Sequence, residues 1–111
     1  MSGRIRVSPP EQRTYEGIIF HSAREMNAYI GFRIIEKSGQ IAKLERQVPF
    51  PLLAWSPSGP VKVSKLILDF RITETDGTQR LYESKGFVTE VYRMKKKLFE
   101  ANYPDMRIVE I

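Results

Sequence analysis

Hydrophobic positions recur with two different periods along this chain of 111 residues. Residues 63–72 are predicted to form a β-strand with one face in the core, because from residue 66 to residue 72 every second residue is apolar. The apolar face carries Leu66, Leu68, Phe70 and Ile72, and the other face carries Ile67, Asp69 and Arg71. Asp69 therefore stands in the middle of a hydrophobic strand, where a carboxylate is costly unless something uses its charge.

Two helices are predicted from the helical spacing of apolar residues and from capping residues. The first is predicted over residues 22–37, because Ser22 is a good N-cap, Glu25 completes a capping box and Gly39 ends the pattern. The second is predicted over residues 89–102, between a Thr89 cap and Pro104. Its inner stripe is expected to comprise Val91, Met94, Leu98 and Ala101.

The remaining segments are predicted to be extended or irregular. Strands are expected over residues 15–20, 41–50, 81–85 and 106–111, with the last strand parallel to the one before it because a helix connects them. Residues 49–60 contain four prolines and are predicted to form a loop, whose Trp55 either tucks into the core, the alternative we favour, or stacks on a base. The fold class is thus α/β, a mixed sheet flanked by helices in the order helix, three mainly antiparallel strands, helix, strand.

The length of the turn around Asp76-Gly77 determines which residue of the next strand lies across from Asp69. A two-residue turn would place Asp69 opposite Ser84, whereas a three-residue loop with a left-handed Gly77 places it opposite Glu83. We favour the three-residue loop, because it also sets Phe70 beside Tyr82 on the apolar face.

The composition of the chain limits the classes of function that it can have. The net charge of +5 favours a polyanionic partner, most commonly nucleic acid. The chain has no Cys and a single histidine, His21, so a thiolate site is excluded and a histidine-based triad is disfavoured. Residues 1–14 are predicted to be a flexible basic arm and residues 15–111 one domain. With no signal peptide and no membrane-length apolar run, a soluble cytoplasmic protein is expected.

Two carboxylates that face each other across strands repel unless a cation lies between them. Carboxylate oxygens, a backbone carbonyl and water are the ligands that Mg²⁺ prefers, and Mn²⁺ accepts the same set. Lys85 projects from the same face as Glu83, where its ammonium would orient an attacking water and offset charge on a phosphate. Without other support, the same residues would be interpreted as a cross-strand charge pair.

Asp69, a hairpin and then Glu83-Ser84-Lys85 resembles the D…(D/E)-x-K signature of the PD-(D/E)xK, or restriction-endonuclease-like, nucleases. Leu68 stands where that signature usually has proline. Residues 82–89, with Tyr92 and residues 95–99, look like a group of small phage and prophage proteins of unassigned function placed among these nucleases. The resemblance covers most of the chain from Tyr15 onward and implies the restriction-endonuclease-like core.

The resemblance implies a metal-dependent DNA endonuclease that hydrolyses phosphodiester bonds in the cytoplasm of a bacterial host. Similarly small members of the superfamily include junction-resolving enzymes that act as dimers, so resolution of branched DNA by a homodimer is an expectation of the same resemblance. Asp69, Glu83 and the Ser84 carbonyl would bind Mg²⁺, Lys85 would position water, and Glu25 would hold a second ion or merely cap its helix. Contacts to DNA would come from Gln47, Arg93, Lys95, Lys96 and Lys97, although Gln47 on an edge strand and the lysine run are also explained as solvated surface. The alternative is a non-catalytic nucleic-acid-binding or phage-assembly protein that keeps the fold.

Overall fold

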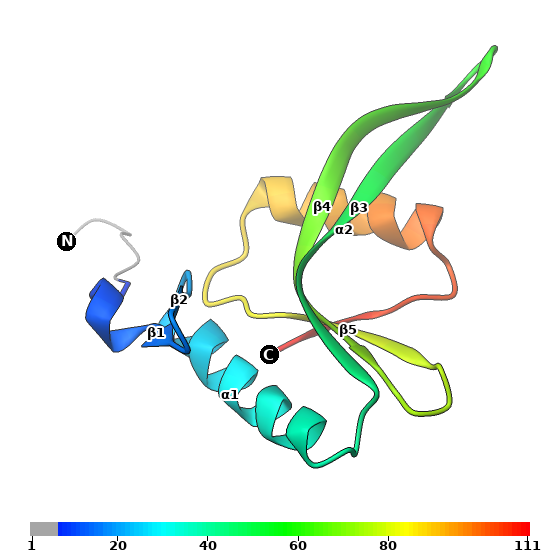
Figure 1. Ribbon diagram of the computed structural model, residues 1–111. Helices are drawn as coiled ribbons and strands as arrows, with labels where there is room; N and C mark the ends of the chain where they lie inside the picture. The colour runs from blue at the N-terminus through cyan, green and yellow to red at the C-terminus, as the bar shows by residue number, and fades with distance from the viewer. Residues whose placement is uncertain (1–6) are drawn as a thin grey trace.

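The computed structural model describes residues 7–111 and is a mixed α/β structure built on one four-stranded sheet (Figure 1). The strands lie in the order β3 (Lys43–Ser56), β4 (Gly59–Thr73), β5 (Gln79–Glu83) and β6 (Ile108–Glu110). The first three are antiparallel, and β6 pairs with β5 in parallel, as the helix between them predicts. The helices are α1 (Ala23–Lys37) and α2 (Glu90–Asn102), with the predicted caps Ser22 and Thr89.

The register of the β4–β5 hairpin confirms the three-residue loop. Phe70 pairs with Tyr82, and the Glu74 N–H donates to the Thr78 carbonyl oxygen (2.7 Å). Gly77 has a φ of 90°, the left-handed conformation that such a loop requires and that glycine adopts without steric cost. This register places Asp69 across from Glu83.

The two helices cover opposite faces of the sheet. Leu81 packs in a core cluster with Tyr92 and Phe99 of α2, whereas its neighbour Tyr82 packs against the cluster that contains Tyr29 of α1. Consecutive residues of a strand point to opposite faces, so each helix has its own face and its own core.

The strands β3 and β4 change face together at Gln47 and Asp69. Before this point Arg46 lies over the Phe20 ring, 4.5 Å from its centroid, on the α1 side; after it Val48 belongs to the α2 core. Their partners in β4 divide between the two faces in the same way. Phe70, the partner of Arg46, belongs to the core on the α1 side, and Leu68, the partner of Val48, belongs to the α2 core. The predicted single apolar face is therefore wrong: its residues are all buried, but they serve two cores. Gln47 marks the switch with a left-handed φ of 51°.

The predicted loop over residues 49–60 is also wrong, because β3 and β4 continue as a long antiparallel arm that ends in a tight turn at residues 57–58 (Figure 1). Pro49 and Pro51 are tolerated because β3 is an edge strand of the sheet, where an N–H on the open side has no ladder bond to make, while Pro57 lies in the turn and Pro60 at the start of β4. Trp55 lies near the end of this arm and is 76% exposed, so the expectation that it joins the core is wrong too.

The predicted inner stripe of α2 requires a correction. Val91, Met94 and Ala101 are exposed, while Tyr92 and Phe99 are buried. The helix is rotated so that its two aromatic residues fill the core, since large rings bury more apolar area than valine or alanine.

The N-terminal segment forms local structure wherever it lies within the described residues. Residues 10–12 form a 3₁₀ turn, and β1 (Thr14–Tyr15) pairs with β2 (Ile18–Ile19). The Arg13 guanidinium donates hydrogen bonds to the carbonyl oxygens of Ser8 (2.8 Å) and Phe20. Residues 1–6 of the predicted basic arm lie outside the described residues.

Candidate active site

Glu25 is placed by the start of α1. Ser22 caps the helix by accepting a hydrogen bond from the Glu25 N–H (3.1 Å), and the Glu25 carboxylate reaches back to the His21 N–H (2.8 Å). In the predicted capping box the carboxylate would bond to the N–H of Ser22 itself. Because only Oε1 is used in this way, Oε2 of the almost completely buried Glu25 is left to face the sheet.

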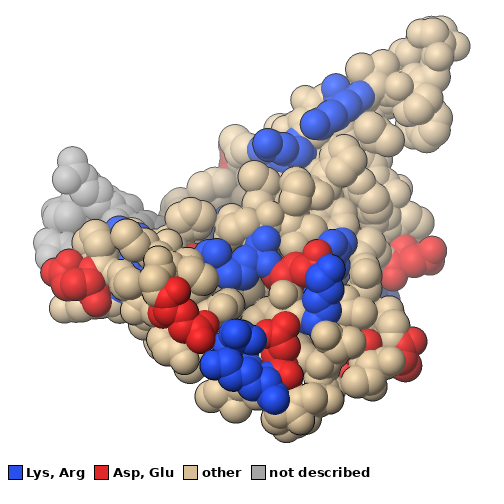
Figure 2. Space-filling view, in the orientation of Figure 1, with Lys and Arg blue, Asp and Glu red and all other residues tan. Residues whose placement is uncertain are grey.

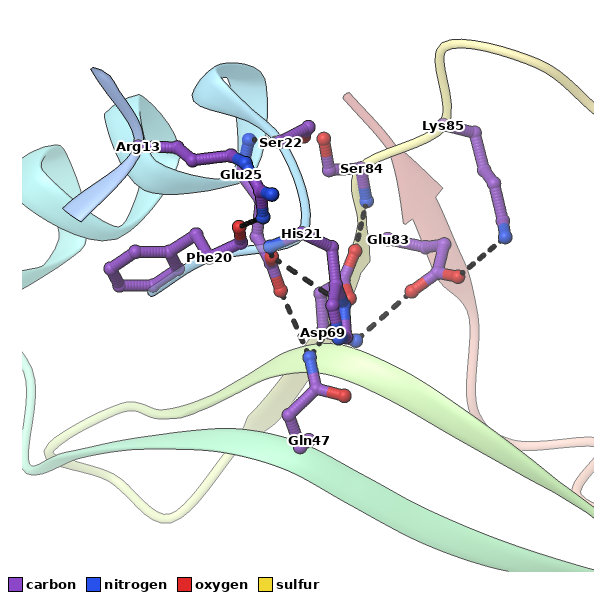
Figure 3. Close-up of polar contacts among 10 residues, drawn as sticks. All are labelled: Arg13, Phe20, His21, Ser22, Glu25, Gln47, Asp69, Glu83, Ser84 and Lys85. Carbon is purple, nitrogen blue, oxygen red and sulfur yellow. Dashed lines mark hydrogen bonds and ion pairs between the residues drawn. The ribbon is translucent and has the colours of Figure 1, made fainter. Parts of the chain in front are cut away.

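Gln47 joins Glu25 to Asp69. Its side-chain Nε2 donates to Glu25 Oε2 (2.9 Å) and to Asp69 Oδ1 (3.1 Å), so one amide group lies between two carboxylates (Figure 3). The left-handed backbone of Gln47 lies in β3 directly across from Asp69, where the strands change face. The interpretation of Gln47 as a solvent-facing edge residue is therefore wrong.

Asp69 and Glu83 are linked through the backbone. The Asp69 N–H donates to Glu83 Oε1 (3.0 Å), and Asp69 Oδ2 accepts from the Ser84 N–H (2.8 Å). Both side chains are buried, at 9% and 4% exposure. The Ser84 hydroxyl is buried as well and has no hydrogen-bond partner among the described residues, which leaves a polar atom unsatisfied beside Asp69.

Lys85 completes the predicted set. Its Nζ lies 3.2 Å from Glu83 Oε2 and 4.4 Å from the centroid of the Tyr92 ring, so an ion pair and a cation–π contact hold the ammonium. Lys85 lines two hollows at once. One, of about 260 Å³, includes Glu83 and Lys95, and the other, of about 640 Å³, includes His21 and Ser84. The charged end of Lys85 thus lies at the border between the buried acids and open surface.

Burial raises the pKa of two of these acids above their ordinary values. Burial, together with the nearby Asp69 charge, raises the pKa of Glu83 to about 7 against the opposing effects of the Asp69 N–H and of Lys85. Burial also raises the pKa of Glu25, again with a contribution from Asp69. Three buried carboxyl groups therefore face three backbone N–H groups, the Gln47 amide and one partly exposed lysine, an arrangement in which a bound cation would lower the cost of ionisation.

One metal-ligand cluster is present among residues 7–111: His21, Glu25 and Asp69 each offer an atom, and these atoms lie within 4.8 Å of one another. Glu83 is outside this cluster, because its two oxygens are directed at the Asp69 N–H and at Lys85. His21 was missed as a ligand by the sequence analysis. The signal was its place one residue before the N-cap of α1, which brings it over the Glu25 carboxylate (3.8 Å).

These donors fit a small divalent cation. Carboxylate oxygens of Glu25, Asp69 and Glu83 suit Mg²⁺ and Mn²⁺, and an imidazole from His21 favours Mn²⁺ of the two. The Gln47 amide stands where two carboxylates converge, and its oxygen is a further suitable ligand once the amide rotates.

The predicted basic residues of α2 do not form one surface. Arg93 and Lys97 line a hollow with Val91 and Met94, Lys95 faces the hollow beside Glu83, and Lys96 pairs with Glu110 (3.3 Å). Of the four, Lys95 is the one that lines the same hollow as Glu83.

The chain belongs to the family described as protein of unknown function (DUF1064), whose profile matches residues 10–111. Comparisons with curated proteins and with solved structures found no match. Among the described residues, no helix has the length and apolar character needed to cross a membrane.

Proposed function

We propose that the protein is a metal-dependent endonuclease that hydrolyses phosphodiester bonds in DNA, with Asp69 at the centre of its site. The observation that carries the proposal is the convergence of Glu25 from α1, Asp69 from β4 and Glu83 from β5, with Lys85 paired to Glu83. Unrelated surface charge pairs have no reason to be buried together at the point where three elements meet.

The arrangement of the elements supports the proposal. The order α1, β3–β4–β5, α2 and parallel β6 is the order that the restriction-endonuclease-like resemblance implies. The acids also occur at the positions expected for that core: on the first helix, in the second core strand and at the end of the third. Family membership is neutral on this point, since the family has no assigned function.

Each residue has a physical role in the proposed reaction. Asp69 would hold the cation together with Glu25 or Glu83 and with the Ser84 carbonyl. The cation, when bound, would supply an activated water and neutralise charge on the phosphate. Gln47 keeps Glu25 and Asp69 close to each other, and Lys85, fixed by Glu83 and Tyr92, presents a positive charge toward the nonbridging phosphate oxygens.

Cleavage of labelled DNA tests this function. Linear duplex, single-stranded, flapped and four-way-junction DNA are incubated with Mg²⁺, Mn²⁺ or EDTA, and the wild type is compared with Asp69→Asn and Lys85→Ala. Lys37→Ala, at the far end of α1, serves as a matched control that removes one lysine away from the site.

We expect metal-dependent cutting that both site variants reduce by at least about a hundredfold and that Lys37→Ala leaves unchanged. The preferred substrate then decides whether branched DNA is the target. Tight binding of DNA with no cutting by the wild type would refute the proposal in favour of a non-catalytic nucleic-acid-binding protein. Cutting that survives Asp69→Asn would refute the site.

A further inference from the structure

The β3–β4 arm extends well beyond the two helices (Figure 1). The last contacts that hold it come from the end of α2: Asn102 bonds to both the N–H (2.6 Å) and the carbonyl oxygen (3.2 Å) of Leu53, and the Tyr103 hydroxyl donates to the Pro51 carbonyl oxygen (2.8 Å). Residues 54–61 lie past this anchor, because Leu53 pairs with Lys62. The radius of gyration of 16.0 Å, against about 13 Å for a compact chain of this length, reflects the projection.

A β-bulge gives the arm one basic face. The register shifts between Leu52 and Leu53, so that Pro51 pairs with Lys65 but Leu53 pairs with Lys62. Paired residues share a face, and Pro51 and Leu53 are two positions apart on β3. Lys62 and Lys65 therefore lie on the same face, although a regular strand would point residues three apart to opposite faces.

Trp55 belongs to that face. It is two positions beyond Leu53 on β3 and pairs with Pro60 across the arm. Its side chain is the most exposed of the large hydrophobic residues in the described chain, at 76%. The opposite face of the arm root carries Phe50 and Leu52, which are buried in the core that α2 covers, so the tryptophan face is the one that this core leaves free.

The arm is free of negative charge. From residue 47 to residue 68 the sequence has no Asp or Glu and has two lysines. Figure 2 accordingly shows blue and no red on the projecting part. The acids of the molecule lie on the body, where six of them pair with arginine or lysine.

The basic face continues into the candidate active site. Lys65 and Ile67 line the same hollow as Glu83, Lys85 and Lys95. Positive side chains therefore follow one path from the buried acids, past the start of α2 and out along β4 to Trp55.

We propose that this face of the arm binds a nucleic-acid strand, with Lys65 and Lys62 on successive phosphates and Trp55 stacked on an unpaired or splayed base. The inference extends the proposed function, which supplies the reason for a path that begins at Asp69. Charge complementarity favours a polyanion over a second copy of this chain, since the basic face has no acidic counterpart on the arm. A tryptophan among lysines provides the stacking and phosphate contacts that single-stranded segments require.

The arm sets a length for the substrate. Asp69 is nine positions along β4 from Pro60, the partner of Trp55, and at about 3.3 Å per residue this stretch spans about 25–30 Å. That distance corresponds to roughly eight nucleotides of a strand with the 3.4 Å rise of duplex DNA, and to fewer nucleotides of an extended single strand. Trp55 would therefore contact a base no more than about eight nucleotides from the bond that the site attacks, which favours DNA with an unpaired region within that distance.

Trp55 is the sole tryptophan of the chain, so its fluorescence reports on the arm directly. The full-length wild type is titrated with a 30-nucleotide single-stranded DNA, a blunt duplex and a flapped duplex in EDTA, which allows binding without cleavage. We expect the single-stranded and flapped DNA to quench the emission at low salt, with affinity that falls steeply as salt is added.

Variants then measure the contribution of Trp55 to DNA binding separately from that of the two lysines. By fluorescence anisotropy of labelled DNA, Trp55→Ala should weaken binding about 5- to 100-fold, whereas Val61→Ala, a matched change at an exposed residue of the opposite face, should not. Lys62→Ala with Lys65→Ala should lower the slope of log affinity against log salt by about 1 to 2, and Lys37→Ala should leave it unchanged.

Equal affinities of wild type and Trp55→Ala would overturn the inference. Emission that shifts with protein concentration and is insensitive to DNA would overturn it in favour of a second copy of the chain on the arm, which sedimentation would confirm. If the protein cuts DNA but its binding does not depend on the arm, the proposed role of the arm is refuted and the nuclease proposal stands. If binding depends on the arm but no cutting occurs, the nuclease proposal is refuted and the role of the arm stands.

Discussion

Replacing Glu83 with glutamine removes a charge that the fold buries at a cost. Glutamine has nearly the same shape and still offers an oxygen to the Asp69 N–H. The variant therefore isolates the charge from the packing. We expect it to unfold less readily than the wild type at pH 8 in metal-free buffer.

The magnitude follows from the pKa of Glu83, which folding raises from an ordinary value of 4.5 to about 7. A carboxyl with a raised pKa binds its proton more tightly in the folded chain, so the free energy of unfolding falls as the pH rises from 4.5 through 7. A pKa shift of this size corresponds to a loss of about 3 kcal/mol in the free energy of unfolding above pH 7. Glutamine also loses the ion pair with Lys85, which is partly exposed, so we expect a net gain of about 1–3 kcal/mol at pH 8.

Urea unfolding in EDTA at pH 5.5, 6.5, 7.5 and 8.5 measures the effect. The difference between Glu83→Gln and wild type should grow with pH across this series. Glu100→Gln, which removes an exposed glutamate of α2, should run parallel to the wild type throughout. A constant difference between Glu83→Gln and wild type, or a wild type that gains stability toward pH 8 as much as the variant, would refute the assignment of a buried, uncompensated charge.

Three further outcomes are expected. Glu25→Gln should keep the fold, because its oxygen still accepts from the His21 N–H, but should weaken Mn²⁺ binding at least tenfold by calorimetry; unchanged affinity would exclude Glu25 as a ligand. Gln47→Ala should cost about 1–3 kcal/mol in urea unfolding, and Gln47→Gly about 1 kcal/mol less, because glycine relieves the left-handed backbone; the reverse order would argue against strain there. Asn102→Ala should speed amide exchange at Leu53 and leave exchange at Phe70 unchanged; protection equal to wild type would show that the arm needs no anchor.

The elements with local signals were predicted from the sequence. Both helix caps, the three-residue loop at Gly77 and the parallel final strand follow from short-range chemistry, and the structure confirms them. The pairing of Phe70 with Tyr82, and with it the approach of Asp69 to Glu83, followed from the loop length.

What the sequence did not predict depends on tertiary context. Pro49 and Pro51 disfavour a strand by local rules, yet they lie in β3, an edge strand whose ladder bonds are made on one side. The change of face at Gln47 is a backbone conformation that no residue type signals, and it decides which side chains Asp69 meets. His21 contacts Glu25 through the local geometry of the helix start, but both residues meet Asp69 only once α1 is docked on the sheet.

The metal site is tested most directly by a crystal grown with Mn²⁺, measured for the anomalous scattering of that ion. We predict a peak in contact with Asp69 and with Glu25 or Glu83, lost in crystals of Asp69→Asn. Saturating Mn²⁺ with no peak at Asp69, or an ion bound only elsewhere on the chain, would contradict a metal-dependent nuclease.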